Sequence, residues 1–480
     1  MANTTTKRDT LFDQLKHIFE PQSVAVIGAS GDLTKFGGRA FFLPLETGYR
    51  GRLYPVNQSR SEVFGIKTYP SILDIPDDIE LAIIAVPAPL VPGVMKECVK
   101  KGVKGVVMIT AGFAETGAEG RKLQDEVVKM AHDAGIRMVG PNSNGIYSSR
   151  VRLNLLYYRA PRLGSISFIS QSGTLGGYLF EWANNKGYGF SKFVSSGNQA
   201  SLNVADYVEY LGHDPDTRAI VLYIEGIQEG QRFVEAAREA VKKKPIIAFK
   251  GGRTAVGSRA TLSHTASMAG ADEVFDAACK QAGIIRCYEV THPFDLAEAL
   301  TQQPLPRGKR VTIVGSGGQC VATADACASL GLELPEFDDD TKRRLVEMLP
   351  PHAPVPTNPV DTAAGGDPMT GPRIVDFLAQ LDYIDGIITH GPMIGWGVTP
   401  ERISSLLTES DLVTSVPEKY GKPVVCTAVG RRDGRGDLGY DLFHHARIPM
   451  YLTPEESARA MWGLMEYAEI RRTMRGSSQL

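Results

Sequence analysis

The chain has few of the features that mark metal sites, disulfide frameworks or membrane segments. Its six cysteines are scattered over 480 residues and none forms a Cys-x-x-Cys pair, so neither a zinc site nor a disulfide scaffold is expected. No run of about 18 apolar residues occurs, and the polar N-terminus lacks the apolar segment of a secretory signal. We therefore expect reduced thiols, no membrane span and a cytoplasmic protein.

Charge of one sign is also scarce. The formal net charge is −2 and no long basic stretch occurs, so neither nucleic acid nor an anionic membrane is expected as a partner. The apolar fraction of 43% and the charged fraction of 22% are ordinary for a globular protein. The length allows roughly three domains.

Short apolar runs alternate along the chain with stretches of helical spacing. Continuous apolar strands that alternate with helices are typical of parallel sheets covered on both faces, so the pattern predicts an α/β fold of doubly wound sheets. The expected strands are 23–27, 52–56, 81–86, 105–109, 137–139, 165–169, 192–195, 219–224, 245–249, 284–286, 310–314, 386–389 and 423–428.

These runs fall into three successive units of similar scale. We predict domains over 11–148, 160–300 and 308–472, and a closing helix over 454–472. A polar connection that contains proline separates the second unit from the third. The proline-rich run 350–359 is a stiff connection inside the third unit.

The first strand is followed by a glycine turn, Val26-Ile-Gly-Ala-Ser30, and shortly afterwards by Lys35. Such a turn lets the N-terminus of the next helix hold a phosphate group. The alternative is a tight turn that binds nothing. The full Gly-x-Gly-x-x-Gly fingerprint is absent, and Asn57 stands where an acidic ribose-binding residue is expected. The sequence therefore disfavours an NAD-dependent oxidoreductase.

Other strand ends carry small or polar residues. In the first unit these are Val86-Pro87, Glu115 and the run Gly140-Pro-Asn-Ser-Asn-Gly145. The carboxyl ends of parallel strands converge on one crevice, which suits an extended nucleotide-like ligand.

The second unit repeats this arrangement. The run Ile169-Ser-Gln-Ser-Gly-Thr174 lies between a strand and a helix, and Ser195-Ser-Gly-Asn-Gln199 follows the next strand. Hydroxyls and backbone N–H groups at such a junction suit a phosphate. Glu225 ends a third strand, where it could orient a histidine. The alternatives for Glu225 are a loop cap or an ion pair with Arg232.

One histidine stands in an unusually small-residue segment. His264 lies within 251–271, where 15 of 21 residues are Gly, Ala, Ser or Thr. Such a run cannot build a core, so we expect a loop. A histidine on a loop of this kind suits a group carrier that moves between two sites. The alternative is an incidental surface histidine.

The ordered motifs resemble one family over nearly the whole chain. The order GAS, PVN, AVPA, GFAE, GPNSNG, SQSG, SSGNQ, YIEG, KGGRT and SHTASMAG is similar to that of the NDP-forming acyl-CoA synthetases, in the succinyl-CoA synthetase superfamily. The arrangement resembles the α subunit of an ADP-forming acetyl-CoA synthetase. The resemblance implies a Rossmann-like CoA-binding domain followed by two flavodoxin-like ligase domains.

The resemblance also implies residue roles. His264 would be the phosphorylated histidine and Glu225 the carboxylate that orients it. The phosphate and acyl-phosphate site would contain Ser170, Ser172, Gly173, Thr174, Gly197 and Asn198. The coenzyme A site would be lined by Gly28, Ser30, Lys35, Asn57, Val86, Pro87 and Glu115.

The implied reaction joins a small carboxylic acid to coenzyme A, with ATP converted to ADP and phosphate through phosphohistidine and acyl phosphate. The sequence contains no Walker A motif and no segment that reads as an ATP-grasp module. We therefore expect a separate ATP-grasp β subunit that holds the nucleotide with Mg²⁺, in an α2β2 or larger assembly. No metal ligand is predicted on this chain.

Some motifs depart from the family pattern. Many members read SHTGALAG and GPNCLG where this chain reads SHTASMAG and GPNSNG. These differences leave the acid open among acetate, a branched or aryl acid and a dicarboxylate. A second hypothesis is a catalytically inactive regulator or scaffold that binds coenzyme A or acyl-CoA.

Overall fold

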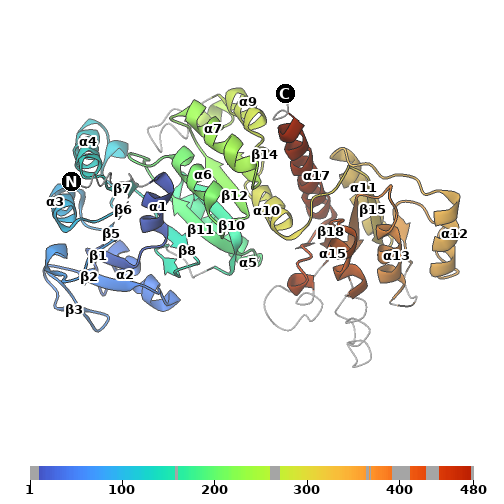
Figure 1. The fold of residues 1–480 in the computed structure, drawn as a ribbon, viewed down its shortest axis with the longest axis horizontal. Coiled ribbons are helices and arrows are strands. Elements are labelled where there is room, and N and C mark those ends of the chain that lie inside the picture. The colour runs from blue at the N-terminus through green and yellow to red at the C-terminus, as the bar shows by residue number, and fades with distance from the viewer. Residues whose placement is uncertain are drawn as a thin grey trace, which may run out of the picture. The chain divides into compact units, whose positions relative to one another are not determined.

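The computed structural model describes residues 10–156, 161–259, 271–363, 367, 369–391, 411–428 and 443–476. The chain divides into two compact units, Met1–Pro293 and Phe294–Leu480, and this division falls inside helix α10 (His292–Gln302). The first unit contains two large sheets and the second contains one (Figure 1). His264 lies outside the described residues.

The first sheet is fully parallel, with strand order β2-β1-β5-β6-β7. Its central strands are buried along their whole length, because helices cover both faces of such a sheet. The strands are β1 (Ser23–Ile27), β2 (Arg52–Val56), β5 (Leu81–Ile84), β6 (Gly105–Met108) and β7 (Arg137–Val139). The helices are α1 (Leu11–Phe19), α2 (Phe36–Thr47), α3 (Val91–Lys101) and α4 (Ala118–Asp133), with the short turns η1 (Ile72–Asp74), η2 (Ala88–Leu90) and η3 (Ala114–Thr116) and the hairpin β3 (Glu62–Val63) and β4 (Ile66–Lys67).

The second sheet has the order β14-β13-β12-β10-β11-β8-β9. Five of its strands are parallel, whereas β8 runs antiparallel to β11 and β9 antiparallel to β8. The strands are β8 (Ile146–Ser148), β9 (Leu153–Asn154), β10 (Leu163–Ser170), β11 (Phe190–Ser195), β12 (Ala219–Ile224), β13 (Ile246–Lys250) and β14 (Ile285–Cys287). The helices are α5 (Gly173–Asn185), α6 (Val204–His213), α7 (Gly230–Val241) and α9 (Asp272–Ala282).

The C-terminal unit is built around a parallel sheet of order β16-β15-β17-β18-β19. Its strands are β15 (Val311–Gly315), β16 (Val360–Asp361), β17 (Gly386–His390), β18 (Val424–Thr427) and β19 (Met450–Tyr451). Its helices are α11 (Gly318–Ser329), α12 (Asp339–Met348), α13 (Thr370–Ala379), α15 (Val416–Tyr420) and α17 (Pro454–Gly476).

The fold confirms the predicted α/β class with mostly parallel sheets. Each predicted strand coincides with an observed one or overlaps it. The prediction placed 146–148 at the end of the first domain, yet β8 pairs with β11 of the second sheet. The domain limits 11–148, 160–300 and 308–472 stay a prediction.

All six cysteines are free and buried, as the sequence predicts. No helix in the described part of the chain is long and apolar enough to cross a membrane.

Candidate active site

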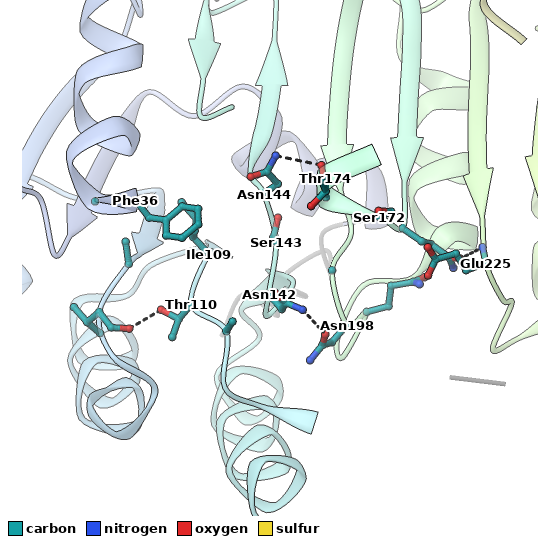
Figure 2. A pocket seen from close by; sticks show the side chains of 18 of the residues that line it. Phe36, Ile109, Thr110, Asn142, Ser143, Asn144, Ser172, Thr174, Asn198 and Glu225 are labelled. Carbon is teal, nitrogen blue, oxygen red and sulfur yellow. Dashed lines mark hydrogen bonds between the residues drawn. The ribbon is translucent and has the colours of Figure 1, made fainter. Parts of the chain in front are cut away.

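A cavity of about 750 Å³ lies in the first unit, where the carboxyl ends of strands from both sheets meet. The first sheet supplies the turns after β1, β5 and β6, and the second supplies those after β10, β11 and β12. Figure 2 shows Phe36, Ile109 and Thr110 on one side of the view and Ser172, Thr174 and Glu225 on the other. The segment 142–144 lies between them. The crevice predicted from the strand ends is therefore present as one cavity.

Nine predicted site residues line this cavity. Six of them lie directly after β1, β10 and β11. These segments approach one another closely because they carry little side-chain bulk. The lining residues are Gly28, Lys35, Val86, Ser172, Gly173, Thr174, Gly197, Asn198 and Glu225.

The glycine turn after β1 depends on the missing side chain. Gly28 has a φ of +92°, and a Cβ added there would lie 2.5 Å from the carbonyl oxygen of Ala85. Any larger residue would therefore be strained and would also clash with the β5 turn. The chain can then enter α2, whose first residues Phe36 and Gly37 face the cavity. No acidic residue occupies the first turn of α2, which suits an anionic ligand.

The second helix N-terminus at the cavity belongs to α5. Ser172 is the N-cap of this helix, and its hydroxyl accepts a hydrogen bond from the Leu175 N–H at 3.3 Å. Within the described residues, the N–H groups of Gly173 and Thr174 have no protein acceptor. They are donors that a phosphoryl or carboxylate oxygen could use.

Glu225 is held at the cavity by its neighbours. Its backbone N–H donates to the side-chain oxygen of Gln171, which also accepts the Gly226 N–H at 2.9 Å. The Gln171 amide in turn donates to the Gly226 carbonyl at 2.5 Å. The Tyr223 hydroxyl donates to the Glu225 carboxylate at 3.2 Å. Burial, together with the adjacent Glu225 charge, raises the pKa of Tyr223, so its hydroxyl stays a proton donor.

The sequence left open an ion pair between Glu225 and Arg232. Arg232 instead pairs with Asp206 at 2.5 Å and with Glu229 at 3.2 Å. Glu225 is 7% exposed and lines the cavity, and its role in orienting a histidine stays a prediction.

Five predicted residues are not among those that line the cavity. Ser30 is buried in the turn, where its hydroxyl accepts the Asp32 N–H at 3.2 Å. Asn57 donates to the Ala29 carbonyl at 2.7 Å, so it braces the turn after β1. Ser170 is fully buried and donates to the Ser172 carbonyl at 2.7 Å, which braces the start of α5.

Pro87 and Glu115 are the other two predicted residues that do not line the cavity. Pro87 precedes the short turn η2, and its carbonyl accepts the Leu90 N–H at 2.9 Å. Glu115 accepts the Asn198 amide at 2.5 Å and the Gly112 N–H at 2.6 Å, so it ties the first sheet's loops to the β11–α6 turn. Burial opposes its ionisation, but the hydrogen bonds from Asn198 and the backbone outweigh burial and lower the pKa of Glu115.

Several lining residues were not singled out as site residues from the sequence. Most lie inside motifs that the strand ends already marked, so their position after a strand was the available signal. Phe36 at the start of α2 and Gln228, which lies beyond the motif that ends β12, carried no such signal. These additional residues include Phe36, Thr110, Asn142, Ser143, Asn144, Gln171, Gln199 and Gln228.

One group of carboxylates among the described residues has metal-like spacing. Oxygens of Glu20, Asp214 and Asp216 lie within 4.8 Å of one another. However, the Lys192 ammonium lies 2.8 Å from Asp214 and 3.4 Å from Glu20. Because a lysine already supplies the positive charge, this group is an ion-pair network and does not fit Mg²⁺.

Comparison with known protein families matches three successive stretches of the chain. A CoA binding domain matches residues 22–149, a succinyl-CoA ligase like flavodoxin domain matches 163–300, and a ligase-CoA domain matches 310–473. A coenzyme A domain followed by two ligase domains defines the class as a CoA-dependent ligase chain.

Individual relatives identify the family. The chain is 40% identical to the α subunit of acetate–CoA ligase (ADP-forming) II from Pyrococcus furiosus, over 95% of this chain and 98% of that protein. It is 32% identical to 4-hydroxybutyrate–CoA ligase (ADP-forming) from Nitrosopumilus maritimus, over 94% of this chain and 64% of that longer protein. A solved acetyl-coenzyme A synthetase 1 from Ca. Korarchaeum cryptofilum, in complex with phosphate and ADP, has a TM-score of 0.84 at 32% identity, over 96% of this chain and 98% of that chain.

The chain therefore belongs to the NDP-forming acyl-CoA synthetases and is an α-subunit-like member of that family. The resemblance drawn from the motifs is confirmed. The comparisons support an acid–thiol ligase and do not support an inactive regulator. They also support the use of coenzyme A and a nucleotide, and the α-subunit names imply a partner subunit.

Proposed function

We propose that this chain, with an ATP-grasp β subunit, joins a small carboxylic acid to coenzyme A while ATP is converted to ADP and phosphate. One observation carries the proposal. The coenzyme A side of the first domain and the N-terminus of α5 line the same cavity as Glu225. A thiol and an activated acid could therefore meet there without leaving the chain.

The reaction divides into three displacements. A ring nitrogen of His264 attacks the γ-phosphorus of ATP, and the bond to the bridging oxygen of ADP breaks. A carboxylate oxygen of the acid then attacks the phosphorus, the N–P bond breaks, and acyl phosphate forms. Finally the thiol sulfur of coenzyme A attacks the acyl carbon, and phosphate leaves with the thiol proton. The second step converts the poor oxide leaving group of the carboxylate into a phosphate, which leaves readily in the third step.

The residues of the cavity have separate roles in this scheme. The N–H groups of Gly173 and Thr174 bind phosphoryl oxygens, because the positive end of the α5 dipole favours negative charge. Lys35 and the N-terminus of α2 bind the anionic part of coenzyme A. Glu225 accepts a hydrogen bond from His264 and so sets which ring nitrogen reacts.

The partner supplies the nucleotide chemistry. Mg²⁺ accompanies ATP on the β subunit, and the assembly is α2β2 or larger. The six free cysteines suit a reducing compartment, and we place the activity in the cytoplasm.

The test is phosphoryl labelling of the whole complex. The chain is mixed with its ATP-grasp partner, γ-labelled ATP and Mg²⁺, and acid-labile label is measured. Wild type and His132→Ala, which removes an exposed histidine on α4, should label equally, whereas His264→Ala should not label. Equal labelling of wild type and His264→Ala would overturn the proposal.

A further inference from the structure

Asn144 is fixed in the wall of the cavity by two hydrogen bonds. Its backbone N–H donates to the buried Ser195 hydroxyl at 3.0 Å. Its side-chain amide donates to the Gly173 carbonyl at 3.3 Å, which dictates that the nitrogen faces the helix (Figure 2). The side-chain oxygen of Asn144 then has no donor among the described residues, although the residue lines the cavity.

The first turn of α5 lies directly against this carboxamide. A Cβ added at Gly173 would be 3.0 Å from the Cβ of Asn144. The backbone N–H groups of Gly173 and Thr174, which have no protein acceptor in the described chain, belong to that same turn. An acyl phosphate whose phosphoryl oxygens these donors bind would therefore lie beside the Asn144 carboxamide.

We infer that Asn144 is a specificity-determining residue that selects an acid carrying a hydroxyl group on its short carbon chain. This inference rests on the proposed function. The hydroxyl donates to the Asn144 oxygen. An unsubstituted acid leaves that oxygen dehydrated and without a donor, and a site built to bond a hydroxyl discriminates against the analogue that lacks it.

An amide N–H of coenzyme A is the other donor that could meet this oxygen. The α5 side of the cavity favours the acid, because the proposed coenzyme A contacts Gly28, Lys35 and Val86 belong to the first domain. The two sources predict different kinetics, so one experiment separates them.

The experiment compares wild type with Asn144→Leu, a residue of similar size without the oxygen, in the complete complex with its ATP-grasp partner. Acyl-CoA formation is measured with three matched pairs of acids: glycolate and acetate, lactate and propionate, and 3-hydroxybutyrate and butyrate. For at least one pair, wild type should favour the hydroxy acid. Asn144→Leu should lower that preference in kcat/KM by about tenfold, the value of one hydrogen bond.

Labelling from ATP in the absence of acid is the folding control, because phosphorylation of His264 does not use the acid. Equal labelling of both proteins shows that Asn144→Leu is folded and that the relay operates. If wild type itself does not label, the proposed function fails instead. The inference is overturned if the folded variant keeps the same preference between paired acids, if wild type prefers no hydroxy acid, or if the main change is a higher KM for coenzyme A.

Discussion

At the scale of single residues, the turn after β1 rests on the absence of a side chain at Gly28. We expect Gly28→Ala to destabilise the first unit by about 1–3 kcal/mol, because the φ of +92° is strained for alanine and its Cβ would lie 2.5 Å from the Ala85 carbonyl oxygen. Coenzyme A binding should weaken as the turn shifts. Calorimetric titration with coenzyme A and thermal unfolding measure the two effects.

Gly31→Ala is the matched control three residues further along. A Cβ at Gly31 would meet nothing within 4 Å, so this variant should stay within about 0.5 kcal/mol of wild type. Equal losses in both variants would show that the close approach at Gly28 has no effect.

Glu115 acts through Asn198 rather than by lining the cavity. In Glu115→Gln the new amide nitrogen would face the Asn198 amide, donor against donor, and we expect a loss of about 1–3 kcal/mol. Glu119→Gln, on the exposed face of α4, should lose almost nothing. Urea unfolding at neutral pH compares the three proteins.

The pH dependence of this difference follows from the pKa of Glu115. Its pKa in the folded chain is lowered from the usual value of 4.5, so the ionised carboxyl stabilises the fold above about pH 4.5. That contribution is lost as the pH falls through the lowered pKa. The difference in unfolding free energy between wild type and Glu115→Gln should be constant above pH 5.5 and should become smaller as the pH falls below that value. A gap that widens on acidification would contradict the hydrogen-bond account.

At the scale of secondary-structure elements, the start of α5 decides both stability and chemistry. Ser172→Ala removes the hydroxyl that caps the helix at Leu175, and we expect a loss of about 1 kcal/mol. The frayed first turn should also lower kcat/KM for acyl-CoA formation by about three- to tenfold. Ser172→Thr keeps a capping hydroxyl and should recover most of the lost stability and most of the lost kcat/KM.

Thr10→Ala provides the comparison, because Thr10 caps α1 and does not line the cavity. It should cost a similar amount of stability and leave the kinetics unchanged. If both variants lose activity in proportion to stability, the α5 cap has no special catalytic role.

The order of strands within a sheet is an element-scale property that short-range patterns do not reveal. The run 219–224 was predicted with the bounds that β12 has, because all six of its residues are apolar and buried. The short strands β8 and β9 were not predicted as part of the second sheet. They have three and two residues. The strand β8 pairs with β11, about 45 residues further along the chain, and β9 pairs with β8.

At the scale of the whole first unit, a buried ion-pair network connects α1 to the second sheet. Lys192 on β11 is 1% exposed and pairs with the fully buried Asp214 and with Glu20, which ends α1. Lys192→Met would leave the buried Asp214 carboxylate without its lysine partner, whereas Arg150 would still pair with Glu20. We expect a loss of about 3–5 kcal/mol. Thermal unfolding monitored by circular dichroism tests this.

Two further variants make the assignment specific. Lys192→Met combined with Asp214→Asn should recover part of the loss, because the buried negative charge goes with its partner. Lys122→Met breaks the exposed pair with Glu119 on α4 and should change stability by less than about 1 kcal/mol. If Lys192→Met loses no more stability than Lys122→Met does, the network is not stabilising.

The sequence by itself determined the fold class, the family and part of the cavity lining. Apolar runs of strand length with glycine-rich ends specify buried parallel strands, and the carboxyl ends of such strands must share an edge. Nine predicted site residues accordingly line one cavity. The assignment of His264 came from its small-residue segment and from the resemblance, and it stays a prediction.

Only the tertiary structure decided which polar residues face the cavity and which brace it. Ser30, Asn57, Ser170 and Glu115 bear the same kinds of groups as the lining residues. Ser30 and Ser170 instead form hydrogen bonds within their own turns, and Asn57 and Glu115 form them with neighbouring turns. Asn144 shows the reverse. The approach of Gly173, 29 residues away, engages its amide nitrogen and leaves its side-chain oxygen without a donor in the described part of the chain. Side-chain direction depends on such long-range contacts, and for that reason residue type and spacing alone could not supply it.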